Sequence, residues 1–478
     1  MTLEEVLAQR PSPGLPRAYQ FPGFERTVLP SGMQLLAVHV PGRPLVSANL
    51  IVRQGASDEP ALLGGVTVLA ARALTEGTER YPGLELIEAS ERLGATLHAE
   101  ASWDAFAASV EVAAPRLRAA LELLAELVFH PTFPEADVAR LRDERLNDLL
   151  QARAEPRRRV EQAFAAAIYT ADSPYSRPAA GDEESVPRLD REELARIHRA
   201  LLNPARTALI VGGDLSGLDL PSMAAEVFGG LGPTLRSATD RSAAPAPVAL
   251  SPIDRTIVRL YDRPGSVQSE VRIGHVGLAR RVPDFHAVQV MASILGGLFN
   301  SRLQMNLREE KGYTYGVGAG FEMRRGSGPF AVRTAVHTAV TVPAIAESLA
   351  ELRKIRDSRV TDAELAAARD YLVGVFPLRF ETPGAVVAAL GGLFVHDLPD
   401  DELARYRPLI EAVTAEDVQT AARAHIDSER LAIIVVGDAA AIAHDLEAAA
   451  FGDLEVLREE LPGDAEAAET EASAETPE

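Results

Sequence analysis

The sequence predicts an α+β fold of two homologous domains, each with an antiparallel-rich sheet packed on helices. Runs that alternate apolar and polar residues, as half-buried strands do, are interleaved with segments of helical periodicity. A Pro-, Ala- and Ser-rich stretch at 233–254 separates two similar halves. The segments SANLIVRQG (47–55) and ALIVGGD (208–214) have counterparts, SEVRIGHVG (269–277) and AIIVVGD (432–438), at nearly the same interval. This shared interval indicates an internal duplication.

The first half begins, after a Pro- and Gly-rich extended segment, with two strands within 26–40 that turn at Pro30-Ser31-Gly32. Further strands are expected at 47–55, 95–102, 105–112 and 205–214. Apolar residues at helical spacing predict helices at 61–74, 84–93, 114–129, 135–154 and 191–202.

The second half repeats this order of elements. Strands are expected at 256–262, 269–277, 314–323, 328–337 and 429–438, with a helical segment at 284–309. The last residues, LPGDAEAAETEASAETPE, have few aliphatic side chains and predict disorder. The predicted boundaries are an extended segment 1–24, a first domain 25–232, a linker 233–254, a second domain 255–452 and a disordered acidic tail 453–478.

Composition excludes several classes of function. The chain of 478 residues has 48 basic and 69 acidic residues, a formal net charge of −21, so neither nucleic acid nor an anionic membrane is an expected partner. The absence of cysteine excludes disulfides, thiolate zinc sites and cysteine nucleophiles. The N-terminus has early acidic residues and no apolar run, so no signal peptide is expected and the predicted location is the cytoplasm.

The most specific motif is GGLFNSRLQMNLREEKGYTYGVGAG, at residues 296–320. It resembles the C-terminal motif of the insulinase/pitrilysin family of zinc metallopeptidases. LPSGMQLLAV, the GASDEP loop and Gly77-Thr78 also lie where that family has them. The resemblance implies a clamshell of two domains and, at Arg308 and Tyr315, a pair that donates hydrogen bonds to a peptide carbonyl and to the developing oxyanion.

The chain departs from this family at the zinc site, which the family builds as His-x-x-Glu-His on a helix before the Gly-Thr. The two histidine positions correspond here to Val68 and Arg72, and the general-base position to Ala71. Downstream, Glu144 matches a family glutamate, but the third ligand position, seven residues later, is Gln151. Valine has no donor atom and arginine is always cationic, so we expect no metal in this chain.

No alternative pair of histidine ligands compensates for these losses. The chain has 10 histidines, and no two are three or four residues apart, the spacing at which two side chains on one helix face could hold a metal. No cofactor is therefore expected in this chain.

The resemblance therefore implies a partner subunit, since the family includes heterodimers in which one chain carries the metal and the other the Arg/Tyr pair. Arg308 and Tyr315 would then act on peptide at the zinc of a partner that carries His-x-x-Glu-His, with an exposed strand edge binding the peptide backbone. Peptidase activity is expected with that partner and not from this chain alone. The alternative is a structural subunit without peptidase activity, like the scaffold subunits of respiratory complexes that share this fold.

Overall fold

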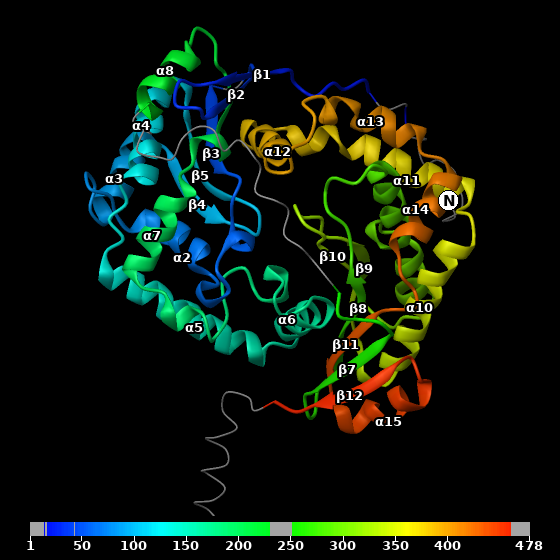
Figure 1. The fold of residues 1–478 in the computed structure, drawn as a ribbon. Coiled ribbons are helices and arrows are strands. Elements are labelled where there is room, and N and C mark those ends of the chain that lie inside the picture. Colours follow the sequence, from blue (N-terminus) through cyan, green and yellow to red (C-terminus); the bar gives the residue numbers. More distant parts are fainter. Residues whose placement is uncertain (1–13, 15–16, 43, 230–250, 460–478) are drawn as a thin grey trace, which may run out of the picture.

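Two mixed six-stranded sheets, each covered by helices, form the molecule (Figure 1). The computed structural model describes residues 14, 17–42, 44–229 and 251–459. This confirms the predicted α+β class with two domain-sized units. Most of the predicted segment 1–24, most of the linker 233–254 and most of the tail lie outside the described residues.

The first sheet has the strand order β1-β2-β6-β3-β5-β4. Only the β2–β6 pair is parallel among the five pairs described for this sheet. Its strands are β1 (Phe24–Val28), β2 (Gln34–His39), β3 (Leu45–Val52), β4 (Thr96–Ala101), β5 (Phe106–Ala113) and β6 (Thr207–Gly213). The helices of this half are α2 (Val66–Ala73), α3 (Leu84–Leu93), α4 (Leu117–Phe129), α5 (Glu135–Ala154), α6 (Pro156–Ile168), α7 (Arg191–Leu201) and α8 (Leu220–Phe228).

The second sheet has the order β12-β7-β11-β8-β10-β9, so β7, β11, β8, β10 and β9 follow the same order as β2, β6, β3, β5 and β4. This correspondence agrees with the duplication that the sequence indicates. Its strands are β7 (Ile257–Asp262), β8 (Gln268–Val276), β9 (Val317–Phe321), β10 (Pro329–His337), β11 (Ala432–Gly437) and β12 (Asp453–Leu457). The helices are α9 (Phe285–Ala292), α10 (Thr341–Asp357), α11 (Asp362–Val375), α12 (Pro383–Val395), α13 (Glu402–Ala412), α14 (Ala415–His425) and α15 (Ala439–Ala449).

Strand β12 corrects the predicted tail, which was assigned as disordered from residue 453. Asp453–Leu457 pair in parallel with β7, so the backbone of this segment gains hydrogen-bond partners at the sheet edge. Arg255 and Arg259 hold its acidic side chains, at 2.7 Å from Asp453 and 3.1 Å from Glu455. The acidity that suggested disorder is thus matched by two arginines, Arg259 on the neighbouring strand β7 and Arg255 just before it.

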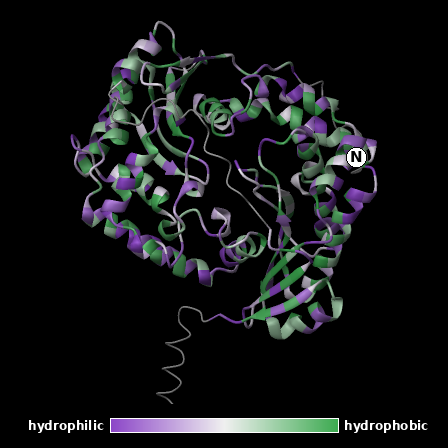
Figure 2. Cartoon of the chain, in the orientation of Figure 1, coloured by the Kyte–Doolittle hydropathy of each residue, from purple (hydrophilic) through white to green (hydrophobic). Residues whose placement is uncertain are grey.

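One helix from each half packs on the sheet of the other half (Figure 1). Helix α12 packs on β3 and β6, where Val386, Leu390 and Phe394 are buried against the first sheet. It is apolar on nearly all sides, which is typical of a fully buried helix, and it is mostly green in Figure 2. In return, Phe164 and the rest of the apolar face of α6 pack on β8 and β11 of the second sheet.

Buried polar contacts also join the two halves beside α6. The carboxylate of Asp104, in the β4–β5 loop, accepts hydrogen bonds from the Arg325 backbone N–H at 2.8 Å and from the Tyr175 hydroxyl at 3.3 Å. Arg325 also pairs with Asp58 at 3.2 Å. The Arg324 guanidinium lies over the rings of Trp103 and Tyr175, at 4.6 and 4.7 Å from their centroids. These contacts fix the β9–β10 hairpin of the second half against the first half.

Within the described residues, no single helix is long and apolar enough to cross a membrane. The segments Asp362–Phe380 and Pro383–Val395 are together long and apolar enough for a span, but the chain bends by 113° between them.

Candidate functional site

Arg308 lies on a π-helical turn, Gln304–Glu310, close to its C-terminal end. Single π-helical turns are frequent at functional sites. The Arg308 guanidinium lies over the ring of Phe299, 4.7 Å from its centroid, and its Nε is 3.4 Å from a carboxylate oxygen of the neighbouring Glu309. The side chain is 36% exposed and Phe299 is 70% exposed, so the pair stands at the surface of the second half.

Tyr315 is 94% exposed, the most exposed of the large apolar and aromatic side chains that the structure describes. It lies in the loop between the π-helical turn and β9. The Thr314 side chain anchors this loop by two hydrogen bonds. The Thr314 hydroxyl donates to the Ala335 carbonyl oxygen at 2.7 Å and accepts from the Gly316 backbone N–H at 3.0 Å. The backbone is therefore anchored while the phenol extends into solvent, and in the described part of the chain its hydroxyl makes no hydrogen bond.

The sequence motif therefore delivers two exposed donors in one short segment, although no hydrogen bond joins Arg308 to Tyr315 among the described residues. Sequence reasoning did not single out Phe299, the ring on which Arg308 rests. The motif at 296–320 could have pointed to this residue, because Phe299 lies within it. Long-range cation–π contacts of this kind, nine residues apart across a turn, are not apparent from helical spacing.

The positions that correspond to the family's zinc site come together on α2 and α5, which pack against each other. Val68 is half-buried and Ala71 is fully buried on α2, whereas Arg72 is exposed, and Gln151 is exposed on α5. Glu144 Oε2 accepts from Arg72 Nη2 at 3.1 Å. An ion pair thus joins the two helices on which the resemblance places the family's zinc ligands.

This ion pair extends into a network. Arg140 donates to the other carboxylate oxygen of Glu144 at 2.7 Å and pairs with Glu76 at 2.7 Å and with Asp137 at 3.2 Å. Two arginines and three carboxylates thereby link α2, the turn that follows it, and α5. No group of three or more His, Cys, Asp or Glu side chains that could hold a metal occurs among the residues described. The donor set at this place does not fit zinc.

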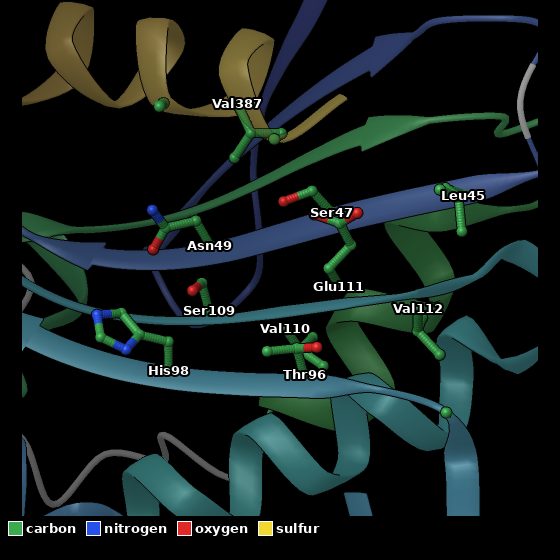
Figure 3. Close-up of a pocket in the computed structure, with 13 residues that line it drawn as sticks. Leu45, Ser47, Asn49, Thr96, His98, Ser109, Val110, Glu111, Val112 and Val387 are labelled. Carbon is green, nitrogen blue, oxygen red and sulfur yellow. The ribbon is translucent and has the colours of Figure 1, made fainter. Parts of the chain in front are cut away.

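A pocket of about 510 Å³ lies on the inner face of the first sheet, beside the start of α12 (Figure 3). The strand register brings Asn49, Ser109 and His98 into one row across β3, β5 and β4, and Ser47 and Glu111 into the neighbouring row. Side chains alternate between the two faces of a strand, so these polar residues share the face opposite the helices α2 and α4. Val387 of α12 closes one side.

In the described structure the strands β4 and β9 each lie at one edge of their sheet, with β1 and β12 at the opposite edges. β4 borders the polar pocket, and β9 begins two residues after Tyr315. A free edge presents unpaired backbone N–H and C=O groups, with which an extended peptide can pair as an added strand. Both halves therefore offer a surface that can bind a peptide backbone.

Comparison with known proteins places both halves in one family. The profile described as insulinase (peptidase family M16) matches residues 35–182, and the profile described as peptidase M16 inactive domain matches residues 188–372, which includes Arg308 and Tyr315. The two matched ranges together cover more than half of the chain.

Relatives and solved structures agree with the profiles. An uncharacterized zinc protease of Mycobacterium bovis is 26% identical over 434 residues, covering 90% of this chain and 96% of the relative. An uncharacterized zinc protease of Streptomyces coelicolor is 25% identical, covering 86% and 89%. The crystal structure of a peptidase M16 inactive domain from Pseudomonas fluorescens superposes with a TM-score of 0.78 at 25% identity, over 87% of this chain and 98% of that one. A protease from Helicobacter pylori shares the fold, with a TM-score of 0.77 at 18% identity over 87% and 99%.

Proposed function

Because the chain belongs to the M16 insulinase family of peptidases, with distant homology to its zinc proteases, we propose that it is the zinc-less subunit of a two-subunit peptidase. In this proposal it binds an extended peptide and supplies Arg308 and Tyr315 to the zinc site of a partner chain. The protein alone has no metallopeptidase activity.

The exposure of Tyr315 is the observation that carries this proposal. A large aromatic side chain that is 94% exposed, on a loop held at both sides by Thr314, gains nothing from its own fold. A structural role would bury the ring, because burying an aromatic side chain contributes about 1.5–3 kcal/mol. Presentation to another molecule explains both the anchored backbone and the free phenol.

Arg308 supports the same interpretation. Its guanidinium has five N–H donors, and its ion pair with Glu309 at 3.4 Å uses few of them. The remaining donors, together with the Tyr315 hydroxyl, can bind a peptide carbonyl oxygen and the oxyanion that forms from it. Donors of this type are worth about 2.7–4 kcal/mol each in the transition state.

The substituted zinc site explains why a partner is needed. Val68, Ala71, Arg72 and Gln151 provide no general base and no ligand other than the weak, neutral amide of Gln151. The Arg72–Glu144 ion pair stabilises the helix pair without a metal. The activated water must therefore come from another chain, whose partner motif is His-x-x-Glu-His.

A pull-down of the tagged chain from its source cells, followed by mass spectrometry, tests the proposal. The expected result is a stoichiometric partner of similar size that carries His-x-x-Glu-His and lacks the Arg/Tyr pair, with peptidase activity in the complex only. Recovery of a membrane respiratory complex, or of the chain alone, contradicts the proposal and favours the scaffold alternative.

A further inference from the structure

A second pocket, of about 240 Å³, lies at the seam between the two halves, away from the polar pocket on the first sheet. It is lined by α6 and by the 175–178 loop of the first half, and by the β9–β10 hairpin of the second half. Trp103, Phe164, Tyr169 and Tyr175 give it aromatic walls. This volume is below the roughly 300–1,000 Å³ typical of pockets for drug-sized ligands, so it suits a single side chain with its neighbouring polar groups.

The charges around this pocket leave one cation in excess. Its two carboxylates are already paired with arginines. Glu161 lies 2.7 Å from Arg272 and 3.4 Å from Arg333, and Glu322 lies 2.5 Å from Arg324. Both acidic groups of the pocket are therefore neutralised without the third lining arginine.

The remaining lining cation is Arg177. Among the described residues it makes no hydrogen bond or ion pair, although its charge is close enough to Glu59 to lower the pKa of that carboxyl. Its guanidinium stem packs against Gly64, where an added Cβ would come within 2.9 Å of the Arg177 Nε, so the glycine makes room for it. Gln162, also in the lining, makes no side-chain hydrogen bond within the described structure.

We propose that this seam pocket binds the C-terminal residue of a short peptide, with its apolar side chain between the aromatic walls and its carboxylate on Arg177. Arginine binds carboxylates through two parallel N–H···O bonds, so a terminal carboxylate complements Arg177 in charge and geometry. The Gln162 amide is available to the preceding peptide group. The choice of a peptide as ligand rests on the proposed function, whereas the pocket and its excess cation do not.

The pocket contains its own reporter, because Trp103 is the single tryptophan of the chain. Its ring already stacks with Arg324, so a ligand that enters beside it changes the surroundings of the indole. Tryptophan emission from the unmodified full-length protein therefore comes only from the wall of this pocket.

The test titrates the isolated chain with acetyl-Ala-Ala-Leu, with the same peptide as its C-terminal amide, and with 4-methylpentanoate, which has the carboxylate and side chain without a peptide. Trp103 emission and calorimetry are recorded together. We expect saturable binding of the acid, roughly tenfold or more tighter than the amide, since a charge-assisted hydrogen bond is lost in the amide. Weaker binding of 4-methylpentanoate is expected, and equal binding overturns the assignment to a peptide terminus.

Arg177→Gln should reduce the preference for the acid to near unity, and Arg177→Lys should restore part of it. Arg188→Gln is the matched control, because Arg188 is exposed on the same half and does not line the pocket. Equal binding of acid and amide, an unchanged preference in Arg177→Gln, or no binding by either method overturns the inference. None of these results depends on a partner, so the proposed function is tested separately.

Discussion

Arg72 Nη2 lies 3.1 Å from Glu144 Oε2, which joins α2 to α5 by an ion pair at the place where the sequence resemblance puts the family's zinc site. The remaining positions offer the metal a methyl group, an alkyl group and an amide. Among the described residues, this helix interface holds an ion-pair network and no cluster of His, Cys, Asp or Glu side chains that could bind a metal.

The first prediction is that zinc and chelators leave the chain unaffected. A bound metal at a hundredfold excess over its dissociation constant would add about 2.7 kcal/mol to the free energy of unfolding. We expect no such gain, because Val68, Arg72 and Gln151 cannot form the site. Thermal unfolding with added zinc or EDTA, together with metal analysis of the dialysed protein, provides the measurement. One retained zinc per chain would contradict it.

The second prediction concerns the ion pair itself. The Arg72 and Glu144 side chains are each 46% exposed, so water and salt screen their attraction. Arg72→Ala should lower the free energy of unfolding by at most about 1 kcal/mol. Urea denaturation measures this change, and a loss well above that value would mean that the pair is more strongly desolvated than its exposure indicates.

The third prediction is a pH dependence caused by Glu59. Its carboxylate accepts the Gly65 and Thr67 backbone N–H groups at 2.8 and 2.6 Å, at the start of α2. Burial raises the pKa of Glu59 from 4.5 to about 7, despite these hydrogen bonds, which lower it. Between pH 4.5 and about 7, the folded state therefore keeps a proton on Glu59 that the unfolded state releases.

The direction in which stability changes with pH follows from this retained proton. The contribution of Glu59 to stability is full below pH 4.5 and is lost as the pH rises through about 7. Relative to Glu59→Gln, the wild type should lose roughly 2–3 kcal/mol of unfolding free energy over this range. Urea denaturation of both proteins at several pH values measures the difference. Parallel pH profiles would show that the carboxyl titrates normally.

The fourth prediction tests the exchanged helix α12. Phe394 is 1% exposed, packs on the first sheet and lies under the Arg53 guanidinium at 4.5 Å. Phe394→Ala should cost about 3–5 kcal/mol, and calorimetry should still show one transition, because the helix belongs to both halves. Leu378→Ala, at an exposed position in the turn Pro377–Phe380 before α12, serves as the control, with a change within about 0.5 kcal/mol. Two separated transitions in the wild type would contradict the coupling.

Many of the elements and the duplicated sheets could be predicted from the sequence because their signals are local, although α6 and α8 were not among the predicted helices. The predicted helices 84–93 and 135–154 agree with α3 and α5, and the similar strand segments form β3 and β8, and β6 and β11. Strand β12 was missed because a short alternation of Leu454 and Val456 stands within an acidic context. Its pairing with β7 joins segments far apart in the chain, so local sequence patterns do not indicate it.

The exchange of α6 and α12 could not be predicted for the same reason. Apolar periodicity indicates that a helix is buried but not which sheet buries it. The seam pocket combines Trp103, Arg177 and Arg324, which are far apart in the chain and carry no shared motif. Arg308 and Tyr315, in contrast, lie in one continuous segment, so a motif could single them out as candidates.

The most direct test of the central claim measures peptide cleavage by the complex with Arg308→Ala or Tyr315→Phe in this chain. Each variant should lower kcat/KM by roughly 10²–10³, mostly through kcat, because each removes a donor that acts in the transition state. The controls Arg359→Ala and Tyr371→Phe change exposed residues of the same types in the same half and should leave the activity unchanged. If Arg308→Ala and Tyr315→Phe both cleave peptide as fast as the wild-type complex, this chain does not serve the partner's zinc site in the proposed way.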